Sequence, residues 1–186
     1  MKIFAIYLRI NLTQKPKWFD KFRKKNEGWF ELHITLIQPR YITDEQVKDL
    51  KSRVKNTLAE LELEEKDKKL IFNKPVFEEL PDGKYLFMWL IEKNLWLMQL
   101  QKKLRAVLEN YDNYCDEITK EYEEDFRPHI TVVESIDANQ KKEVERSFSS
   151  DFMFEGTVKD LVLPVVKNTS KEERENANNL TIFDLY

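Results

Sequence analysis

The chain has 186 residues, of which 41% are hydrophobic and 12% aromatic, so it is long enough to bury a core as one domain or two packed lobes. Charged residues reach 35% but nearly cancel to a net charge of −3, which argues against long nucleic acid held mainly through its phosphates. With three glycines and one cysteine, Cys115, the sequence excludes glycine-rich phosphate loops and intrachain disulfides.

The start of the sequence reads as a strand and lacks the charged and apolar segments of a secretion signal. No apolar run approaches the roughly 18 residues of a membrane-spanning helix. We therefore expect a cytoplasmic protein with no membrane partner. Cys115 lies in an acidic stretch without a basic neighbour, so we expect an incidental free thiol there.

The first predicted strand covers residues 2–10, where apolar side chains alternate with others. The basic segment 15–25 then predicts a short amphipathic helix that begins at Pro16. Two interpretations of this helix stay open. In one, its aromatic residues pack on the sheet and its lysines face water. In the other, its cations and the nearby Trp29 form a mouth that attracts and stacks a nucleotide, with these cations as candidates: Lys21, Arg23 and Lys24.

A short β-branched run carries His33 and is expected to end at Pro39. A capping box at residues 43–46 predicts the start of a long amphipathic helix, followed by a polar loop. Residues 70–91 predict a β-hairpin around the turn Pro81-Asp82-Gly83.

The second half begins with a helix that Asn94 is predicted to cap and that ends near Leu108. Residues 112–125 are expected to form a surface connection. After the strand that carries His129, residues 137–140 repeat the capping pattern.

Two further strands are predicted near the end, at about 152–166 and 180–185. We expect the first to be interrupted near Glu155-Gly156. The polar residues 167–179 between the two strands are expected to form a mobile loop.

The tripeptide His-Ile-Thr occurs twice, at His33-Ile34-Thr35 and at His129-Ile130-Thr131, and these are the only two histidines in the chain. Side chains at positions i and i+2 of a strand share a face, so each motif places an imidazole beside a hydroxyl. The intervening isoleucine faces the opposite, buried side and holds the strand in register.

The motifs lie 96 residues apart, and each is followed by a capped helix and two strands. This pattern indicates a weak internal duplication within one bilobal domain, residues 1–186, with halves of about 1–92 and 93–186. The predicted fold is α/β (α+β), with two antiparallel sheets flanked by helices and related by a pseudo-twofold axis. Both histidines would then share a central cleft.

Two imidazoles in one cleft can divide acid and base catalysis between them, because the unperturbed histidine pKa lies near 6.5. The neutral imidazole takes a proton from the attacking hydroxyl, and the protonated one gives a proton to the leaving oxygen. The hydroxyls of Thr35 and Thr131 would hydrogen-bond the phosphoryl oxygens. This chemistry needs no metal and no other cofactor.

Three alternatives stay open beside this interpretation. The histidines could be ordinary core residues, although the repeated tripeptide argues against that. They could bind a metal together with Glu31 or Glu134, although no known metal-binding spacing is present. Finally, the same cleft could belong to a catalytically silent module that binds RNA or a nucleotide.

The paired H-x-T motifs, with Trp29-Phe30 before the first, resemble the 2H phosphoesterase superfamily of LigT-like 2′-5′ RNA ligases and 2′,3′-cyclic nucleotide phosphodiesterases. The resemblance covers nearly the whole chain. It implies a bilobal fold in which both histidines and both threonines act on phosphodiesters next to a 2′- or 3′-hydroxyl.

One position departs from this family, whose LigT-like members often have an arginine where this chain has Glu134. Arg127 or Arg40 is therefore a candidate for the phosphate-binding cation. The resemblance implies an RNA terminus, a 2′,3′-cyclic phosphate, a 2′-5′ oligonucleotide or a cyclic oligonucleotide signal as substrate. We expect a monomer without an obligate protein partner.

Overall fold

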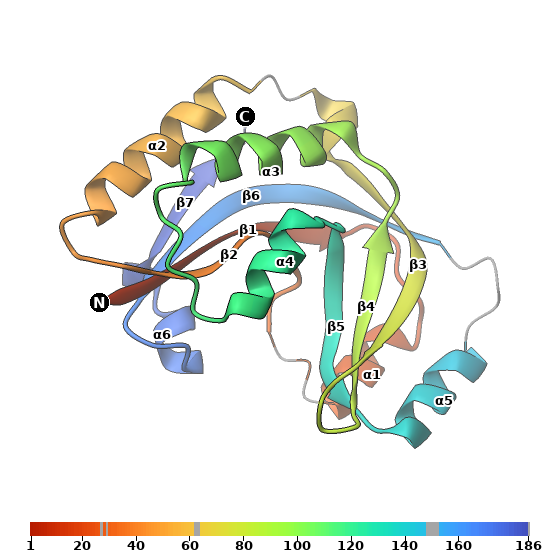
Figure 1. Cartoon of the computed structure of the whole chain (residues 1–186). Helices are drawn as coiled ribbons and strands as arrows, with labels where there is room; N and C mark the ends of the chain where they lie inside the picture. Colours follow the sequence, from red (N-terminus) through yellow and green to blue (C-terminus); the bar gives the residue numbers. More distant parts are fainter. Residues whose placement is uncertain (27, 29, 62–63, 148–152, 186) are drawn as a thin grey trace.

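The computed structural model describes residues 1–26, 28, 30–61, 64–147 and 153–185 (Figure 1). The strands within these ranges are β1 (Lys2–Leu12), β2 (His33–Ile42), β3 (Lys69–Glu79), β4 (Tyr85–Ile91), β5 (His129–Ile136), β6 (Phe154–Val166) and β7 (Leu180–Asp184). The helices are α1 (Phe19–Lys25), α2 (Val47–Ala59), α3 (Leu95–Val107), α4 (Glu117–Glu124), α5 (Ala138–Ser147) and α6 (Lys171–Glu175), with short 3-10 turns at Glu65–Lys68 and Ala177–Asn179.

All the strands join in one antiparallel sheet of seven strands, in the order β2-β1-β6-β3-β4-β5, with β7 also paired to β6. The predicted α/β class is confirmed. The two expected sheets are continuous, however, because β6 is long enough to serve both. Its residues 154–157 pair with β3, and its residues 156–166 pair with β1.

The predicted interruption of this strand near Gly156 is wrong. Gly156 lies where β6 passes between β1 and β3, opposite both Leu12 and Leu70. A Cβ at this position would lie 2.9 Å from the carbonyl oxygen of Asn11 and 3.1 Å from Phe72, so the crowded junction requires glycine. The glycine therefore permits continuity where the sequence had suggested a break.

The strand order does not follow the predicted halves of the sequence. The late strand β6 pairs with β1 and also carries β7, whereas the early strand β4 pairs with β5 and with β3. Each lobe thus combines strands from both halves of the chain. The internal duplication stays a prediction.

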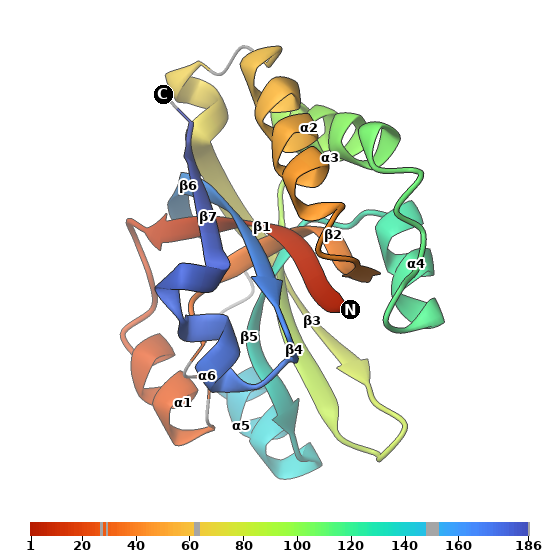
Figure 2. The same ribbon diagram turned by 90° about the vertical axis from the view of Figure 1, so that its left-hand side faces the viewer.

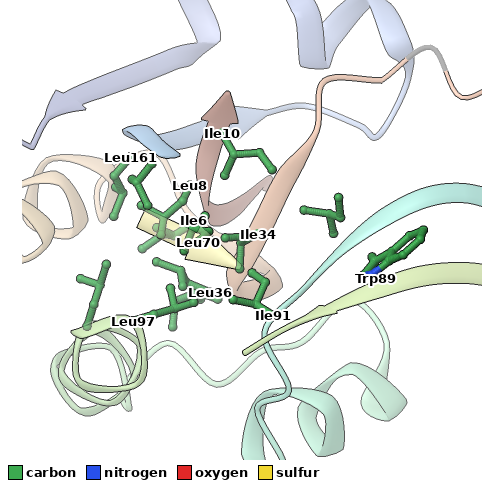
Figure 3. Close-up of a cluster of buried hydrophobic side chains, with 14 of the residues drawn as sticks. Ile6, Leu8, Ile10, Ile34, Leu36, Leu70, Trp89, Ile91, Leu97 and Leu161 are labelled. Carbon is green, nitrogen blue, oxygen red and sulfur yellow. The ribbon is translucent and has the colours of Figure 1, made fainter. Parts of the chain in front are cut away.

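Helices α2 and α3 lie side by side over one face of the sheet (Figure 2). The core includes buried side chains of α2 and α3 together with Phe19 and Phe22 of α1. The predicted alternation of the first strand is confirmed, because its four apolar residues are nearly fully buried: Phe4, Ile6, Leu8 and Ile10. Side chains from β2, β3, β4, β6 and α3 join this cluster (Figure 3). Its burial holds the two strands that carry the motifs, since their apolar faces belong to it.

The starts of α3 and α5 follow the sequence signals closely, whereas α2 begins at Val47, after the predicted box at residues 43–46. The side chain of Asn94 accepts a hydrogen bond of 2.9 Å from the amide of Leu97 at the start of α3. The second capping box is complete, with reciprocal bonds between Asp137 and Gln140 of 2.7 and 2.8 Å. In the first box, the side chain of Gln46 accepts from the amide of Thr43 at 3.1 Å.

Three other boundaries differ from the predictions. Helix α1 begins at Phe19 rather than Pro16. The predicted connection 112–125 contains α4, and the predicted loop 167–179 contains α6 and a 3-10 turn. These helices are short, with few apolar residues to give a clear periodic signal.

The fourth difference is at Pro39, which does not end β2. β2 is an edge strand, and its pairing with β1 shifts register between Ile37 and Arg40. A proline is tolerated in an edge strand or at a register shift because its missing amide donor then removes no hydrogen bond from a regular ladder.

Candidate active site

The two motif strands occupy the two ends of the strand order, β2 at one end and β5 at the other. Although neither pairs with the other, the curvature of the sheet brings residues of β2 and β5 into contact. The fold therefore places two segments that are 96 residues apart in the sequence side by side.

Within each motif strand, the predicted alternation of faces is confirmed. Ile34 and Ile130 are fully buried in the core, as are the residues two positions further on. The histidines and threonines point to the other face and are half-buried. This position leaves them accessible from one side only, as catalytic groups on a rigid strand would be.

The two imidazoles make equivalent hydrogen bonds. Nδ1 of His33 lies 2.8 Å from the carbonyl oxygen of Glu31, and Nδ1 of His129 lies 2.7 Å from that of Arg127. A carbonyl oxygen only accepts, so Nδ1 carries the proton in both rings and Nε2 is left for chemistry. The local backbone thus gives both histidines the same tautomer and the same reactive nitrogen.

Burial lowers the pKa of both imidazoles below the ordinary value of 6.5, because it disfavours the charged form. The charge of His129 lowers the pKa of His33 further, whereas the carboxylate of Glu134 on β5 raises it. His33 on β2 therefore interacts electrostatically with two residues of β5. This coupling supports a single site shared by the two strands.

Tyr7 on β1 lies in the same site, although it was not among the predicted site residues. Its ring centroid lies 4.8 Å from that of His33, and it pairs with Thr35 across the β1–β2 ladder. Burial and the charge of Glu31 raise the pKa of its phenol. The signal was present, because the alternation of the first strand placed Tyr7 on the face opposite the core.

The cross-strand partners of the second motif are apolar. His129 lies opposite Leu90 in the β4–β5 ladder, and Thr131 lies opposite Met88. The two motifs are thus similar in backbone and different in their neighbours, which allows one histidine to act as base and the other as acid.

The prediction that Arg40 binds phosphate is wrong. Its side chain is buried, and its guanidinium donates to the carbonyl oxygens of Leu108 and Tyr111 and to the carboxylate of Glu123. The guanidinium also lies 4.4 Å from the ring centroid of Tyr114. Arg40 is therefore a structural residue behind β2.

Arg23 is likewise not an exposed cation at the predicted substrate mouth, because its guanidinium bonds two backbone carbonyls. Nη2 donates to the carbonyl oxygen of Phe30 at 2.5 Å, and Nε donates to that of Val132 at 3.2 Å. Phe19 and Phe22 of the same helix are buried, as the first interpretation of α1 expects for its aromatic residues. A role of the α1 lysines in attracting substrate stays a prediction.

The remaining candidates for substrate binding are placed as follows. Lys21 and Lys24 are exposed on α1, and Arg127 is exposed two residues before His129. The guanidinium of Arg127 lies 3.6 Å from the carboxylate of Asp125. Trp29 lies outside the described residues. In the part of the chain that the structure describes, no group of three or more His, Cys, Asp or Glu side chains is arranged to hold a metal.

A family model described as the 2′-5′ RNA ligase superfamily matches residues 14–169, which include both H-x-T motifs. The chain belongs to this superfamily. The resemblance to 2H phosphoesterases is thereby confirmed. No curated protein matches the sequence. Within the described residues, no helix is long and apolar enough to cross a membrane.

The solved structures similar to this superfamily member include Usb1 from Kluyveromyces marxianus, with 11% identity and a TM-score of 0.51 over 98% of this chain and 97% of that one. A structure of the same protein with uridine monophosphate has 8% identity and a TM-score of 0.50, over 98% of each chain. At these identities the likeness shows the fold alone.

Proposed function

We propose that this protein is a metal-independent phosphodiesterase that acts on 2′,3′-cyclic phosphates or 2′-5′-linked nucleotides. The observation that carries the proposal is the matched pair of imidazoles on β2 and β5, each with its Nδ1 proton bonded to a backbone carbonyl. Two histidines with free Nε2 atoms, electrostatically coupled across one site, are the groups that acid-base cleavage of a phosphodiester needs.

In the proposed reaction, Nε2 of the neutral imidazole accepts a proton from water as the water oxygen attacks phosphorus. The bond between phosphorus and the leaving ribose oxygen breaks, and the protonated imidazole gives its Nε2 proton to that oxygen. Each transfer contributes about 10²–10⁴-fold in rate. The hydroxyls of Thr35 and Thr131 donate to the phosphoryl oxygens, where negative charge increases in the transition state.

The lowered pKa of both imidazoles fits the base better than the acid. Burial lowers the pKa in each case, so the free site holds mainly neutral rings near neutral pH. The negative charge of a bound phosphodiester stabilises one protonated imidazole and so supplies the acid when substrate is present. Binding and protonation are thus linked.

The neighbours of the histidines favour a substrate with few phosphates. The charge of Glu134 acts on His33, so a carboxylate stands where LigT-like relatives often have arginine. A second phosphate close to this carboxylate would be repelled. A 2′,3′-cyclic nucleotide or an RNA terminus is therefore our first choice, and a cyclic oligonucleotide signal is the second. The structure of Usb1 with uridine monophosphate supports a nucleotide in this fold.

The test is a panel of 2′,3′-cyclic nucleotides, 2′-5′ oligoadenylates and cyclic dinucleotides, each assayed with and without EDTA. We expect hydrolysis of at least one compound, at the same rate in both conditions. Loss of activity in EDTA would contradict metal independence. Binding without hydrolysis of any compound would favour the alternative of a silent RNA- or nucleotide-binding module. Cytoplasmic location and a monomeric state stay predictions.

A further inference from the structure

Arg23 connects the two motif strands, although the proposed reaction does not use it. Its guanidinium donates to the carbonyl oxygen of Phe30, three residues before His33, and to that of Val132, three residues after His129. It also lies 5.9 Å from the ring centroid of Phe19 and 5.2 Å from that of Phe30. One side chain of α1 therefore bonds the segment before β2 and the middle of β5.

Glu123 makes a second connection at the other end of the motifs. One carboxylate oxygen accepts from the backbone amide of Gln38 at 2.9 Å, and the other accepts from the guanidinium of Arg40 and, at 3.2 Å, from the hydroxyl of Tyr114. Glu123 is only 1% exposed. It lies six residues before His129, and Gln38 lies five residues after His33.

The two connections lie on opposite sides of the histidines. Arg23 connects residues before the first motif to residues after the second motif. Glu123, which lies before the second motif, bonds a residue after the first motif. No ladder of backbone hydrogen bonds links β2 to β5 among the described residues. Direct pairing between β2 and β5 therefore does not define the spacing of the two motifs, whereas these two side chains connect the segments beside them.

We propose that Arg23 and Glu123 are positioning residues that together hold the two histidines at the separation which the reaction needs. This inference rests on the proposed function. A bridging phosphate requires both Nε2 atoms at hydrogen-bond distance, and a misplacement of about 1 Å can reduce the rate by about 10²-fold. The buried ion pair of Glu123 and Arg40 has a large desolvation cost, so its contribution to geometry explains it better than its contribution to stability.

The kinetic test compares Arg23→Met and Glu123→Gln with matched controls. Methionine keeps an aliphatic chain between Phe19 and Phe30 but removes both hydrogen bonds. Arg53 is the control for Arg23, because it also donates to a backbone carbonyl, that of Val107 at 3.2 Å, and lies 5.9 Å from a tyrosine ring, but it connects α2 to α3. Glu124→Gln is the control for Glu123, since Glu124 pairs with Arg105 on the surface.

We expect kcat to fall about tenfold or more in Arg23→Met and Glu123→Gln, with KM changed by less than about threefold, because a displaced acid-base pair affects the transition state more than binding. The control variants Arg53→Met and Glu124→Gln should keep the parent kcat. If all four variants have the parent kcat, the inference is overturned.

A second measurement separates this inference from the proposed function, because it needs no catalysis. The chain has two histidines, so their imidazole Cε1–H signals in NMR spectra are assigned by single replacements. The positive charge of His129 lowers the pKa of His33, so His129→Gln should raise that pKa in the parent protein. In the Arg23→Met background, His129→Gln should change the pKa of His33 by less than half as much as in the parent protein.

Reduced coupling in Arg23→Met would support the inference even if the parent hydrolyses no compound in the panel. Full coupling would overturn it, whatever happens to kcat, because the histidines would then have kept their separation. Arg23→Lys, which retains one donor and the positive charge, gives a second variant for the same measurement and should show an intermediate coupling. If His129→Gln changes the pKa of His33 as much in Arg23→Lys as in the parent protein, that result would also count against the inference.

Discussion

Tyr7 packs against the imidazole of His33, with ring centroids 4.8 Å apart and the ring planes tilted by 52°. The backbone carbonyl of Glu31 bonds Nδ1 of the same imidazole. His33 is therefore held by two contacts from different segments, a ring contact with Tyr7 and a hydrogen bond from Nδ1 to the carbonyl oxygen of Glu31. An imidazole fixed in this way loses little conformational freedom when substrate binds.

The first prediction concerns the Tyr7 ring. Tyr7→Leu should lower kcat by about tenfold, because the imidazole loses the ring that restricts it, whereas Tyr7→Phe should stay within about threefold of the parent. Tyr41→Leu, at an exposed position near the far end of β2, is the control. If Tyr7→Phe is as impaired as Tyr7→Leu, the hydroxyl and not the ring is what matters.

The second prediction is a loss of stability in mild acid. Burial lowers the pKa of both histidines below 6.5, so the unfolded chain binds more protons than the native protein just below that pH. The free energy of unfolding should therefore fall as the pH drops from 6.5 through the folded pKa values, and should recover above 6.5. Urea unfolding at several pH values between about 7.5 and 5.5 measures this change in the free energy of unfolding.

Replacing the histidines identifies their share of this pH dependence. His33→Gln and His129→Gln should each reduce the slope of stability against pH, because each removes one group that takes up a proton on unfolding. Carboxylates that titrate in the same range affect all the variants alike. An unchanged slope in both variants would show that neither histidine has a lowered pKa in the native protein.

The third prediction concerns Glu134, whose carboxylate raises the pKa of His33. Glu134→Arg should increase kcat/KM for a nucleotide with an additional terminal phosphate relative to the same nucleotide without it, by about tenfold, because an attraction replaces a repulsion. Glu145→Arg makes the same change of charge at an exposed position of α5 and should leave this ratio unchanged. Equal ratios in the two variants would place Glu134 away from the substrate.

The fourth prediction concerns the exposed lysines of α1. If they attract substrate, replacing Lys21 and Lys24 by glutamate should lower kcat/KM several-fold at low salt, with little effect on kcat, and the loss should disappear at high salt. The double replacement of Lys48 and Lys51, exposed on α2, is the matched control. Equal behaviour of the two double variants would assign the α1 lysines to a solvated surface.

Local patterns predicted the motif strands and the starts of α3 and α5 correctly, but they did not predict α4 or α6. The alternation around His33 and His129 requires only that one face be buried, and the cap at Asn94 requires only residues three positions away. Such features depend on neighbours in the sequence, so the sequence alone is sufficient for them.

The roles of the arginines could not be predicted in this way. Arg40 directly follows a proline in an edge strand, which reads as an exposed position, but its carboxylate partner Glu123 is 83 residues away. Arg23 similarly bonds Val132 at a separation of 109 residues. Contacts of this kind depend on how the sheet curves, and no pattern within either helix or strand specifies that curvature.

The long β6 strand is a second example. Its residues read as two strands because Gly156 disfavours a regular strand, yet the junction with β1 and β3 leaves no room for a side chain. The sequence shows the glycine but not the two neighbouring backbones that require it. The same limitation explains why one continuous sheet was expected as two.

Whether His33 and His129 act together as base and acid is tested by kcat of His33→Ala, His129→Ala and the double variant on the best compound of the panel, measured across pH. Each single replacement should lower kcat by about 10²-fold or more, and the double variant should be only slightly worse, since paired catalytic groups act as a unit. The parent should show a rise and fall of rate with pH, which each single variant loses on one side. Full turnover in both single variants would contradict the account.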